Sequence, residues 1–222
     1  ANKRREEREK PLKMRTDLIP PLGFVPVYTK SYIFGTVDGN GKETIVFTSI
    51  LPDNAPEWLV PDAEELGFTT AKIMKKTIQS YDSSASGTDY LEIPHTSIPR
   101  DQSYLGAWRY EPNTDIGNGA KGIGINTATA KELHKDLIRL SRKPKLMQLD
   151  IDFQRALEAG SDTSAIVTKK NTLRDLTAQV DSLNVTETTV VGVTTQIRTV
   201  WDSDLLGVYP QSYIDGVTPV MI

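Results

Sequence analysis

The sequence predicts an α+β protein with an extended N-terminal arm, a β-hairpin and loop-rich body, and a C-terminal helical domain of three to four short helices. Residues 24–51 carry two β-type runs around a turn, and residues 82–125 are rich in turn formers. From residue 145 to 207, apolar side chains recur at three- and four-residue spacing, which places them on one face of a helix. The expected segments are an arm (1–23), a β/loop-rich domain (24–125), a helical domain (126–207) and a C-terminal extension (208–222).

Composition limits the classes of function. A chain of 222 residues can form one large or two small domains. Its net charge of −3 disfavours nucleic acid as a partner, because general nucleic-acid binders carry a basic excess. With no cysteine, disulfides, thiolate zinc sites and cysteine nucleophiles are excluded. The longest apolar runs fall short of the roughly 18 residues of a membrane span, and the charged start lacks a signal peptide's apolar region. We therefore expect a protein that folds in a cytoplasm and does not associate with a membrane.

The arm at 1–23 mixes charges with Pro11, Pro20 and Pro21, which is typical of extended chain. Two interpretations stay open: a floppy tail, or an arm that orders by draping over a neighbouring subunit. Its basic residues are interspersed with glutamates, so a nucleic-acid-binding arm is disfavoured.

A β-hairpin is expected within residues 24–51. Its two β-type runs flank DGNG at 38–41, and Asn and Gly tolerate the positive φ of tight turns. A calcium loop is the alternative, but Glu43 stands where that loop requires glycine. Further along, Asp62 with Glu65 predicts a capped helix start, and residues 69–81 fit either a short helix or a strand.

The region 82–125 reads as long loops with interspersed aromatic residues. Loops of this length are uncommon in compact domains and are usually functional or bound to a partner. Trp108 and Tyr110 are the candidate loop contacts. We favour the interpretation that such aromatics pin the loops to the body or to a neighbour. The alternative is that they stack on sugar rings.

Gly117, Gly119 and Gly122 formally match the dinucleotide-binding fingerprint. That fingerprint requires a buried strand before it and a helix that begins at it. Here a turn-like EPNTDI precedes the glycines, and the next helix begins later. The glycines therefore predict a flexible loop, and no cofactor is expected.

The C-terminal half reads as helices separated by polar breaks. Thr127 is the expected cap of the first helix, and Pro144 ends that helix or begins the next. Gly160 followed by Ser or Asp predicts a stop and a new start, and Thr186 with Glu187 opens the last helix. The apolar stripes are Ala130, Leu133, Leu137 and Leu140; Leu146, Leu149, Phe153 and Leu157; Ile166, Leu173, Leu176 and Val180; and Val190, Val193, Ile197 and Trp201.

No catalytic or metal-binding constellation is predicted. His95 and His134 lie in different segments and share no ligand spacing with acidic residues. The DxD pairs at 150–152 and 202–204 point in different directions on a helix, so solvated faces or N-caps explain them better than a cation site. No Ser–His–Asp arrangement can be singled out. The chain is therefore expected not to be an enzyme.

Two stretches resemble a known family. FQRALEAGSDTSAIVTKKNTLRDLT, which begins at residue 153, and TETTVVGVTTQIRTVWDSDLLG, which ends at 207, resemble the C-terminal helical module of tailed-bacteriophage tail and tail-fibre assembly proteins. In that group a helix ends in LRD(L/I/V)T, and an acid/threonine-capped helix closes on W…LLG. The resemblance covers about a quarter of the chain. The matching residues are Leu173, Arg174, Asp175, Leu176, Thr177, Trp201, Asp202, Leu205, Leu206 and Gly207.

The resemblance implies a non-enzymatic structural or accessory protein of a tailed-phage virion. It would join tail, baseplate or fibre subunits in a homo- or hetero-oligomer, residing in the tail region and, during assembly, in the host cytoplasm. Leu173, Leu176, Trp201, Leu205 and Leu206 would close a small core that docks on a partner. Arg174 and Asp175 would pair with neighbouring helices or cap carbonyls. The alternatives are a tail-fibre assembly chaperone that the virion does not retain and a glycan-binding receptor module.

Overall fold

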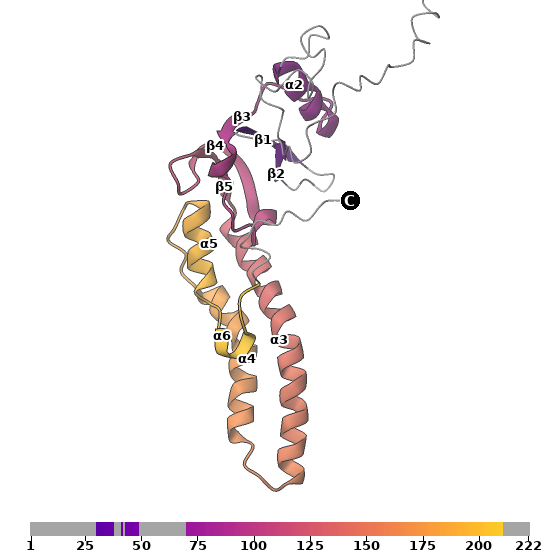
Figure 1. Ribbon diagram of the computed structural model, residues 1–222, viewed down its shortest axis with the longest axis vertical. Coiled ribbons are helices and arrows are strands. Elements are labelled where there is room, and N and C mark those ends of the chain that lie inside the picture. Colours follow the sequence, from indigo (N-terminus) through magenta and orange to yellow (C-terminus); the bar gives the residue numbers. More distant parts are fainter. Residues whose placement is uncertain (1–29, 38–40, 42, 49–69, 211–222) are drawn as a thin grey trace, which may run out of the picture.

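The structure is a computed structural model that describes residues 30–37, 41, 43–48 and 70–210. The expected arm at 1–23, the capped helix at Asp62 and most of the extension at 208–222 lie outside these residues. Figure 1 shows strands gathered at one end and a long helical hairpin projecting from them, which is the predicted α+β class.

A three-stranded antiparallel sheet forms the far end of the body, in the order β2-β1-β3. The strands are β1 (Lys30–Val37), β2 (Glu43–Thr48) and β3 (Leu91–Pro94). The β1–β2 pairing runs from Tyr32↔Thr48 to Val37↔Glu43, which confirms the predicted hairpin. The helix α2 (Thr70–Tyr81) resolves the helix-or-strand ambiguity. Met74 and Ile78 on α2 are buried against Tyr32 and Phe34 of the sheet.

A second, two-stranded sheet corrects the expectation of loops over 82–125. It consists of β4 (Trp108–Asp115) and β5 (Lys121–Ile125), which pair antiparallel from Trp108↔Ile125. Two 3₁₀ turns, η2 (His95–Ser97) and η3 (Leu105–Ala107), precede it.

The GxGxxG glycines belong to this ribbon. Gly117 and Gly119 lie in its connection and Gly122 lies in β5, all with positive φ. The backbone N–H of Ile116 donates to the Ala120 carbonyl over 2.9 Å and closes the connection. These glycines therefore form an ordered β-turn region, not the flexible loop that was expected, and no helix begins at them.

Helices occupy most of residues 127–206. They are α3 (Thr127–Glu158), α4 (Ser164–Ser182), α5 (Val190–Arg198) and α6 (Ser203–Leu206). The expectation of short helices broken at Pro144 is wrong for α3, because Pro144 lies inside one helix of 32 residues. Proline has no N–H, so the helical hydrogen bond to the Leu140 carbonyl is missing. The helix continues nevertheless, and Leu146 and Leu149 just beyond Pro144 pack against the cluster that contains Leu173 and Leu176.

Of three predicted helix boundaries, two are shifted along the chain and one is confirmed. The N-cap of α3 is Asn126, not Thr127, and its side chain accepts from the N–H of Thr129 over 2.9 Å. The N-cap of α5 is Thr189, three residues after the predicted Thr186. The stop at Gly160 is confirmed, with φ 65.

Apolar clusters join the body and the helices. One contains Ile33, Trp108 and Ile123 from the strands together with Val190 from α5. A second combines Tyr104 and Ala107 of the η3 region with Ala130, Val193 and Ile197 of the helices. The predicted β/loop-rich and helical segments therefore share their cores across the boundary near residue 125.

Candidate interaction surface

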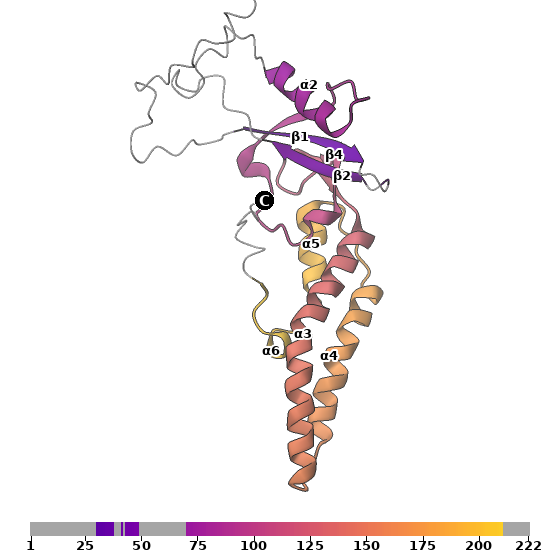
Figure 2. The same cartoon turned by 90° about the vertical axis from the view of Figure 1, so that its right-hand side faces the viewer.

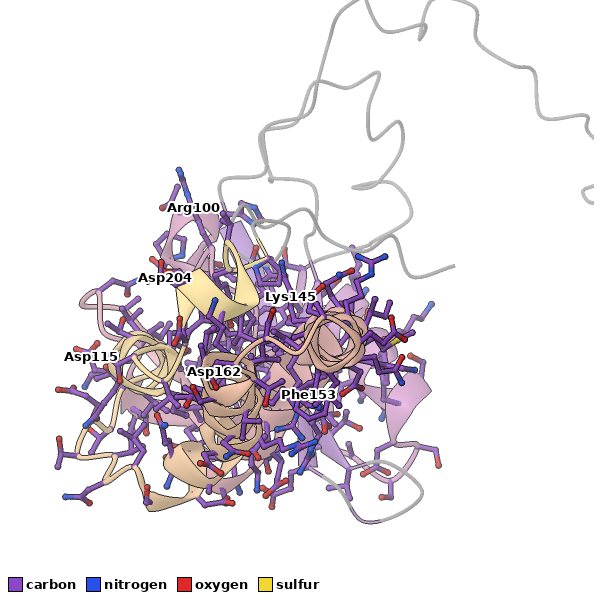
Figure 3. All side chains as sticks on the ribbon, turned by 90° about the horizontal axis from the view of Figure 1, so that it is seen from below. Arg100, Asp115, Lys145, Phe153, Asp162 and Asp204 are labelled. Atoms are coloured by element: carbon purple, nitrogen blue, oxygen red, sulfur yellow. The ribbon has the colours of Figure 1, made fainter. Side chains whose placement is uncertain are left out.

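The hairpin of α3 and α4 extends well beyond the body, and the two helices lie side by side in Figures 1 and 2. Figure 3 looks along this hairpin from its tip, with Asp162 labelled near the turn. The Asp162 carboxylate accepts from the Ser164 hydroxyl over 2.5 Å and from the Ser164 N–H over 3.0 Å, and these hydrogen bonds lower the pKa of Asp162. The polar groups of the turn therefore bond within the turn itself. The long faces of α3 and α4 are the remaining surface of the hairpin on which another protein could bind.

One stripe of α3 runs from the body out to exposed positions. Its residues follow alternating steps of three and four: Ala130, Leu133, Leu137, Leu140, Pro144, Met147 and Ile151. Ala130 is fully buried, and Leu133 and Leu137 pack against the same cluster. Further out, Leu140 is 70% exposed, Met147 60% and Ile151 44%. Leu140 shares the predicted face with Leu133 and Leu137, but the cluster that covers those two residues does not include it, so only the inner part of the predicted stripe is buried within the chain.

The opposite side of α3 packs on α4. Leu146 and Leu149 lie against the cluster that contains Ile138, Leu173 and Leu176. Leu149 follows Met147 by two residues, which is about 200° around the helix. The outer half of α3 therefore has apolar residues on two faces, and α4 covers one of them.

The outermost part of the hairpin is held by polar and mixed contacts. The Lys170 Nζ lies 2.6 Å from an Asp150 carboxylate oxygen and 5.2 Å from the centre of the Phe153 ring. Leu157 is 57% exposed and Val167 40%. Leu157 lies one turn beyond Phe153 on the predicted stripe, and most of its side chain is exposed.

The motif that carries the family resemblance divides into buried and exposed residues. Leu173, Leu176 and Leu206 are nearly fully buried in one cluster, with Trp201 and Leu205 packed against it. The short helix α6, which lies beside α3 in Figures 1 and 2, contributes Leu205 and Leu206 to this cluster.

Arg174 and Asp175 are exposed, and within the described part of the chain neither side chain forms an ion pair. The expected pairing with neighbouring helices is therefore not seen among these residues. The Arg174 carbonyl accepts from the Arg142 guanidinium over 3.0 Å.

The W…LLG ending closes on itself. The Trp201 Nε1–H donates to the Gly207 carbonyl over 2.9 Å. The Asp202 carboxylate accepts from the N–H groups of Asp204 and Leu205, each over 3.0 Å, and so caps α6. Gly207 has φ 87, a left-handed conformation that glycine adopts without strain. These contacts give the motif a structural role within its own chain.

A buried polar network ties the hairpin base to the body. The His134 Nε2 lies 2.8 Å from the Val200 carbonyl, which can only accept, so Nε2 carries the proton. Nδ1 is then an acceptor for the Tyr104 hydroxyl at 2.8 Å. Burial lowers the pKa of His134 and raises the pKa of Tyr104, so both stay neutral near pH 7. His134 therefore acts as a packing residue.

The same junction receives the end of the described chain. Tyr209 stacks against His134, and the Arg198 guanidinium lies 4.2 Å from the centre of the Tyr209 ring. Arg198 also donates to the Asp101 carboxylate over 2.6 Å. The hairpin base is therefore fixed by residues from the η3 region, α3, α5 and the C-terminal segment.

The two aromatic residues predicted as loop contacts have different surroundings. Trp108 is 1% exposed and packs edge-on against Phe47, so it cannot present its ring to a ligand. Its Nε1–H has no hydrogen-bond partner among the described residues. Trp108 therefore lies in a strand and anchors the chain to its own core, in agreement with the favoured interpretation, and the alternative that its ring stacks on a sugar is wrong.

Tyr110 is half-buried, and its hydroxyl donates to the Asp89 carboxylate over 3.0 Å. Burial raises the pKa of this hydroxyl. Tyr110 lines a hollow of about 270 Å³ together with Thr36, Glu43 and Asp82. Of the two candidate loop contacts, Trp108 and Tyr110, only Tyr110 is accessible to a ligand.

Within residues 30–37, 41, 43–48 and 70–210, no group of three or more His, Asp or Glu side chains could hold a metal ion. The Asp150 and Asp152 side chains instead bind Lys170 and Gln148. The His95 Nδ1 lies 2.9 Å from the Ser31 hydroxyl. None of the helices in the described part of the chain combines the length and apolarity that a bilayer span requires.

Comparisons with protein-family models, curated proteins and solved structures found no match. The motif between residues 153 and 207 and the surfaces described above are the features that bear on function. The projecting hairpin, with its exposed stripe on α3, is the surface best suited to contact another protein.

Proposed function

We propose that this chain is a non-enzymatic structural or accessory protein of a tailed-phage virion. It joins tail, baseplate or fibre components through protein–protein contacts. The resemblance of residues 153–207 to tail and tail-fibre assembly proteins supports the virion role. The partners are other phage structural proteins, and the protein passes through the host cytoplasm during assembly.

The observation that carries this proposal is the exposed apolar stripe on the projecting half of α3. Leu140, Met147 and Ile151 expose much of their surface along one line of the helix. Contiguous apolar surface rimmed by polar residues marks protein-interaction sites. Lys143 and Asp150 provide such a polar rim.

The rest of the fold suits an attachment role. The polar network around His134 joins α3, at the base of the hairpin, to the η3 region of the body. The arm at 1–23 is proposed as a second contact, consistent with its mixed charge and prolines. The exposed stripe on the projecting half of α3 offers a contact away from the body, which supports an attachment role.

Quantitative mass spectrometry of purified particles tests the proposal. The expected result is peptides of this chain at a fixed copy number relative to a known tail protein. If the chain is abundant in the infected-cell lysate and missing from particles, the virion role is wrong and the alternative, a tail-fibre assembly chaperone, is supported.

A glycan-binding receptor module is the second alternative, and the Tyr110 hollow is the observation that favours it. An aromatic ring beside the Glu43 and Asp82 carboxylates is a suitable arrangement for stacking on a sugar and accepting its hydroxyl hydrogens. Glycan-array binding that is lost in Tyr110→Ala but kept in the matched variant Tyr81→Ala would support this function. A blank array would remove it.

A further inference from the structure

We propose that the exposed part of the α3 stripe is a seam for a second copy of this chain. Its residues are Leu140, Pro144, Met147 and Ile151. The two α3 helices pack antiparallel, and each α4 lies on the side of its own α3 that faces away from the seam. This inference does not depend on the virion role and concerns the purified protein alone.

The spacing of the stripe is the first argument. From Ala130 to Ile151, apolar residues follow a strict seven-residue repeat, with steps of three and four. An unstrained α-helix drifts about 20° per heptad from such a repeat, so a sequence that keeps it matches a helix that supercoils with a partner. Leu140 and Met147 take the d positions, and Pro144 and Ile151 take the a positions.

The second argument is the abrupt loss of cover along one continuous stripe. Its inner residues, up to Leu137, pack against the chain's own α5 and η3 region. Beyond Leu137 the residues of the same face are exposed, by 70% at Leu140, 60% at Met147 and 44% at Ile151. Leu146 and Leu149, elsewhere around the helix, pack on the cluster that α3 shares with α4 and α6. The stripe ends where Gln154 and Glu158 take the next seam positions. The open segment from Leu140 to Ile151 spans about 16 Å at 1.5 Å per residue.

The stripe matches itself when reversed. In an antiparallel pair, Leu140 lies opposite the partner's Ile151, and Pro144 lies opposite the partner's Met147. The two-fold axis repeats both contacts, as in isologous dimers. Apolar side chains thus face each other along the whole open segment.

Charges at the rim favour the same arrangement. Lys143 and Asp150 both occupy the g position beside the seam. In the antiparallel pair Lys143 lies opposite the partner's Asp150, and the symmetry produces this pair twice. The Asp150 carboxylate already binds Lys170 of its own chain, and its second oxygen can accept from another lysine.

Placement of the bodies separates the antiparallel arrangement from the parallel one. A parallel pair also brings opposite charges together, Asp150 with the partner's Arg155, so charge alone does not select the direction. However, a parallel pair places the two β-rich bodies side by side at one end, where Leu133 and Leu137 are already packed against their own chain. The antiparallel pair places the bodies at opposite ends of the paired α3 helices.

Sedimentation velocity of the purified full chain tests the seam. At micromolar concentration we expect a species of twice the chain mass that dissociates on dilution, because the seam is short. Ile151→Glu should sediment as a monomer at the same concentration. Val167→Glu is the matched control, since Val167 is exposed on α4 off the seam, and it should remain dimeric. Unchanged circular dichroism shows that each variant is folded. A wild type that stays monomeric, or an Ile151→Glu variant that stays dimeric, would overturn the seam.

Disulfide trapping tests the direction, and the natural absence of cysteine makes single-cysteine variants unambiguous. Leu140→Cys and Ile151→Cys proteins are oxidised separately and as an equal mixture. The antiparallel seam predicts a cross-linked heterodimer in the mixture and no cross-link in either protein alone, since like positions are about 16 Å apart along the axis. Cross-linking of each variant with itself, or no cross-link in any sample, would overturn the antiparallel arrangement.

Discussion

The Tyr104 hydroxyl donates to Nδ1 of His134 over 2.8 Å, and both side chains are fully buried. Tyr104 immediately precedes η3 in the body, and His134 lies in the second turn of α3. This hydrogen bond therefore connects the β-rich end to the base of the projecting hairpin. The orientation of the hairpin is fixed at this point.

Tyr104→Phe should destabilise the fold. The substitution keeps the ring but leaves the buried Nδ1 of His134 without a donor, which costs about 1–3 kcal/mol in the free energy of unfolding. Tyr81→Phe is the control, because Tyr81 is 56% exposed and its variant should stay within about 0.5 kcal/mol of wild type. Urea unfolding measures both. Equal stability of the two variants would contradict the role given to this hydrogen bond.

Stability should fall in mild acid through His134. Burial holds the pKa of folded His134 below its ordinary value of 6.5, so the unfolded chain binds more protons there. The stabilisation is therefore complete above pH 6.5 and is lost as pH falls from there through the folded pKa. Comparing His134→Gln with wild type between pH 8 and pH 5 isolates this group from the carboxylates. The stability difference between the two proteins should shrink as pH falls, and a constant difference would contradict the assignment.

The LRDLT motif should separate into structural and exposed residues. Leu173→Ala should cost about 2–5 kcal/mol in the free energy of unfolding, because it leaves a cavity in a packed cluster. The neighbouring Arg174→Ala should change it by less than about 0.5 kcal/mol, since the side chain is exposed. Chemical denaturation measures both. If Arg174→Ala is as damaging as Leu173→Ala, the burial pattern described for α4 is wrong.

Gly122 should tolerate alanine worse than Gly119 does. Both have positive φ, 121 for Gly122 and 85 for Gly119, so each substitution strains the backbone by about 1–2 kcal/mol. A Cβ at Gly122 would also lie 2.5 Å from the Ile33 Cδ1, whereas one at Gly119 meets nothing within 4 Å. Thermal unfolding should therefore show a larger loss for Gly122→Ala. Equal losses would mean that the two sheets do not pack as closely as described.

The sequence predicted elements whose signal is local. The β1–β2 hairpin followed from β-type runs around DGNG, and Gly160 marked the turn of the α3/α4 hairpin. The ribbon of β4 and β5 was missed because glycines in a strand are typical of loops. In the folded chain Gly122 permits close approach to Ile33 and Leu91, a contact between distant segments that no local pattern contains.

The candidate surface was only partly predictable. Periodicity shows which residues share a helix face, but it does not show which neighbour covers that face. Leu140 and Leu173 therefore looked equivalent in sequence, although one is 70% exposed and the other 1%. For Trp108 the sequence left both a structural and a ligand-binding role open for a related reason, since its burial depends on Phe47 from a distant strand.

The most direct test of the proposed attachment role is a cryo-electron microscopy map of the particle with this chain located in it. The account predicts paired rods of density for α3 and α4 in the tail region, with the side of α3 that carries Met147 and Ile151 against another protein subunit. A map in which the chain is missing from the particle, or in which that side of α3 faces solvent in every copy, would contradict it.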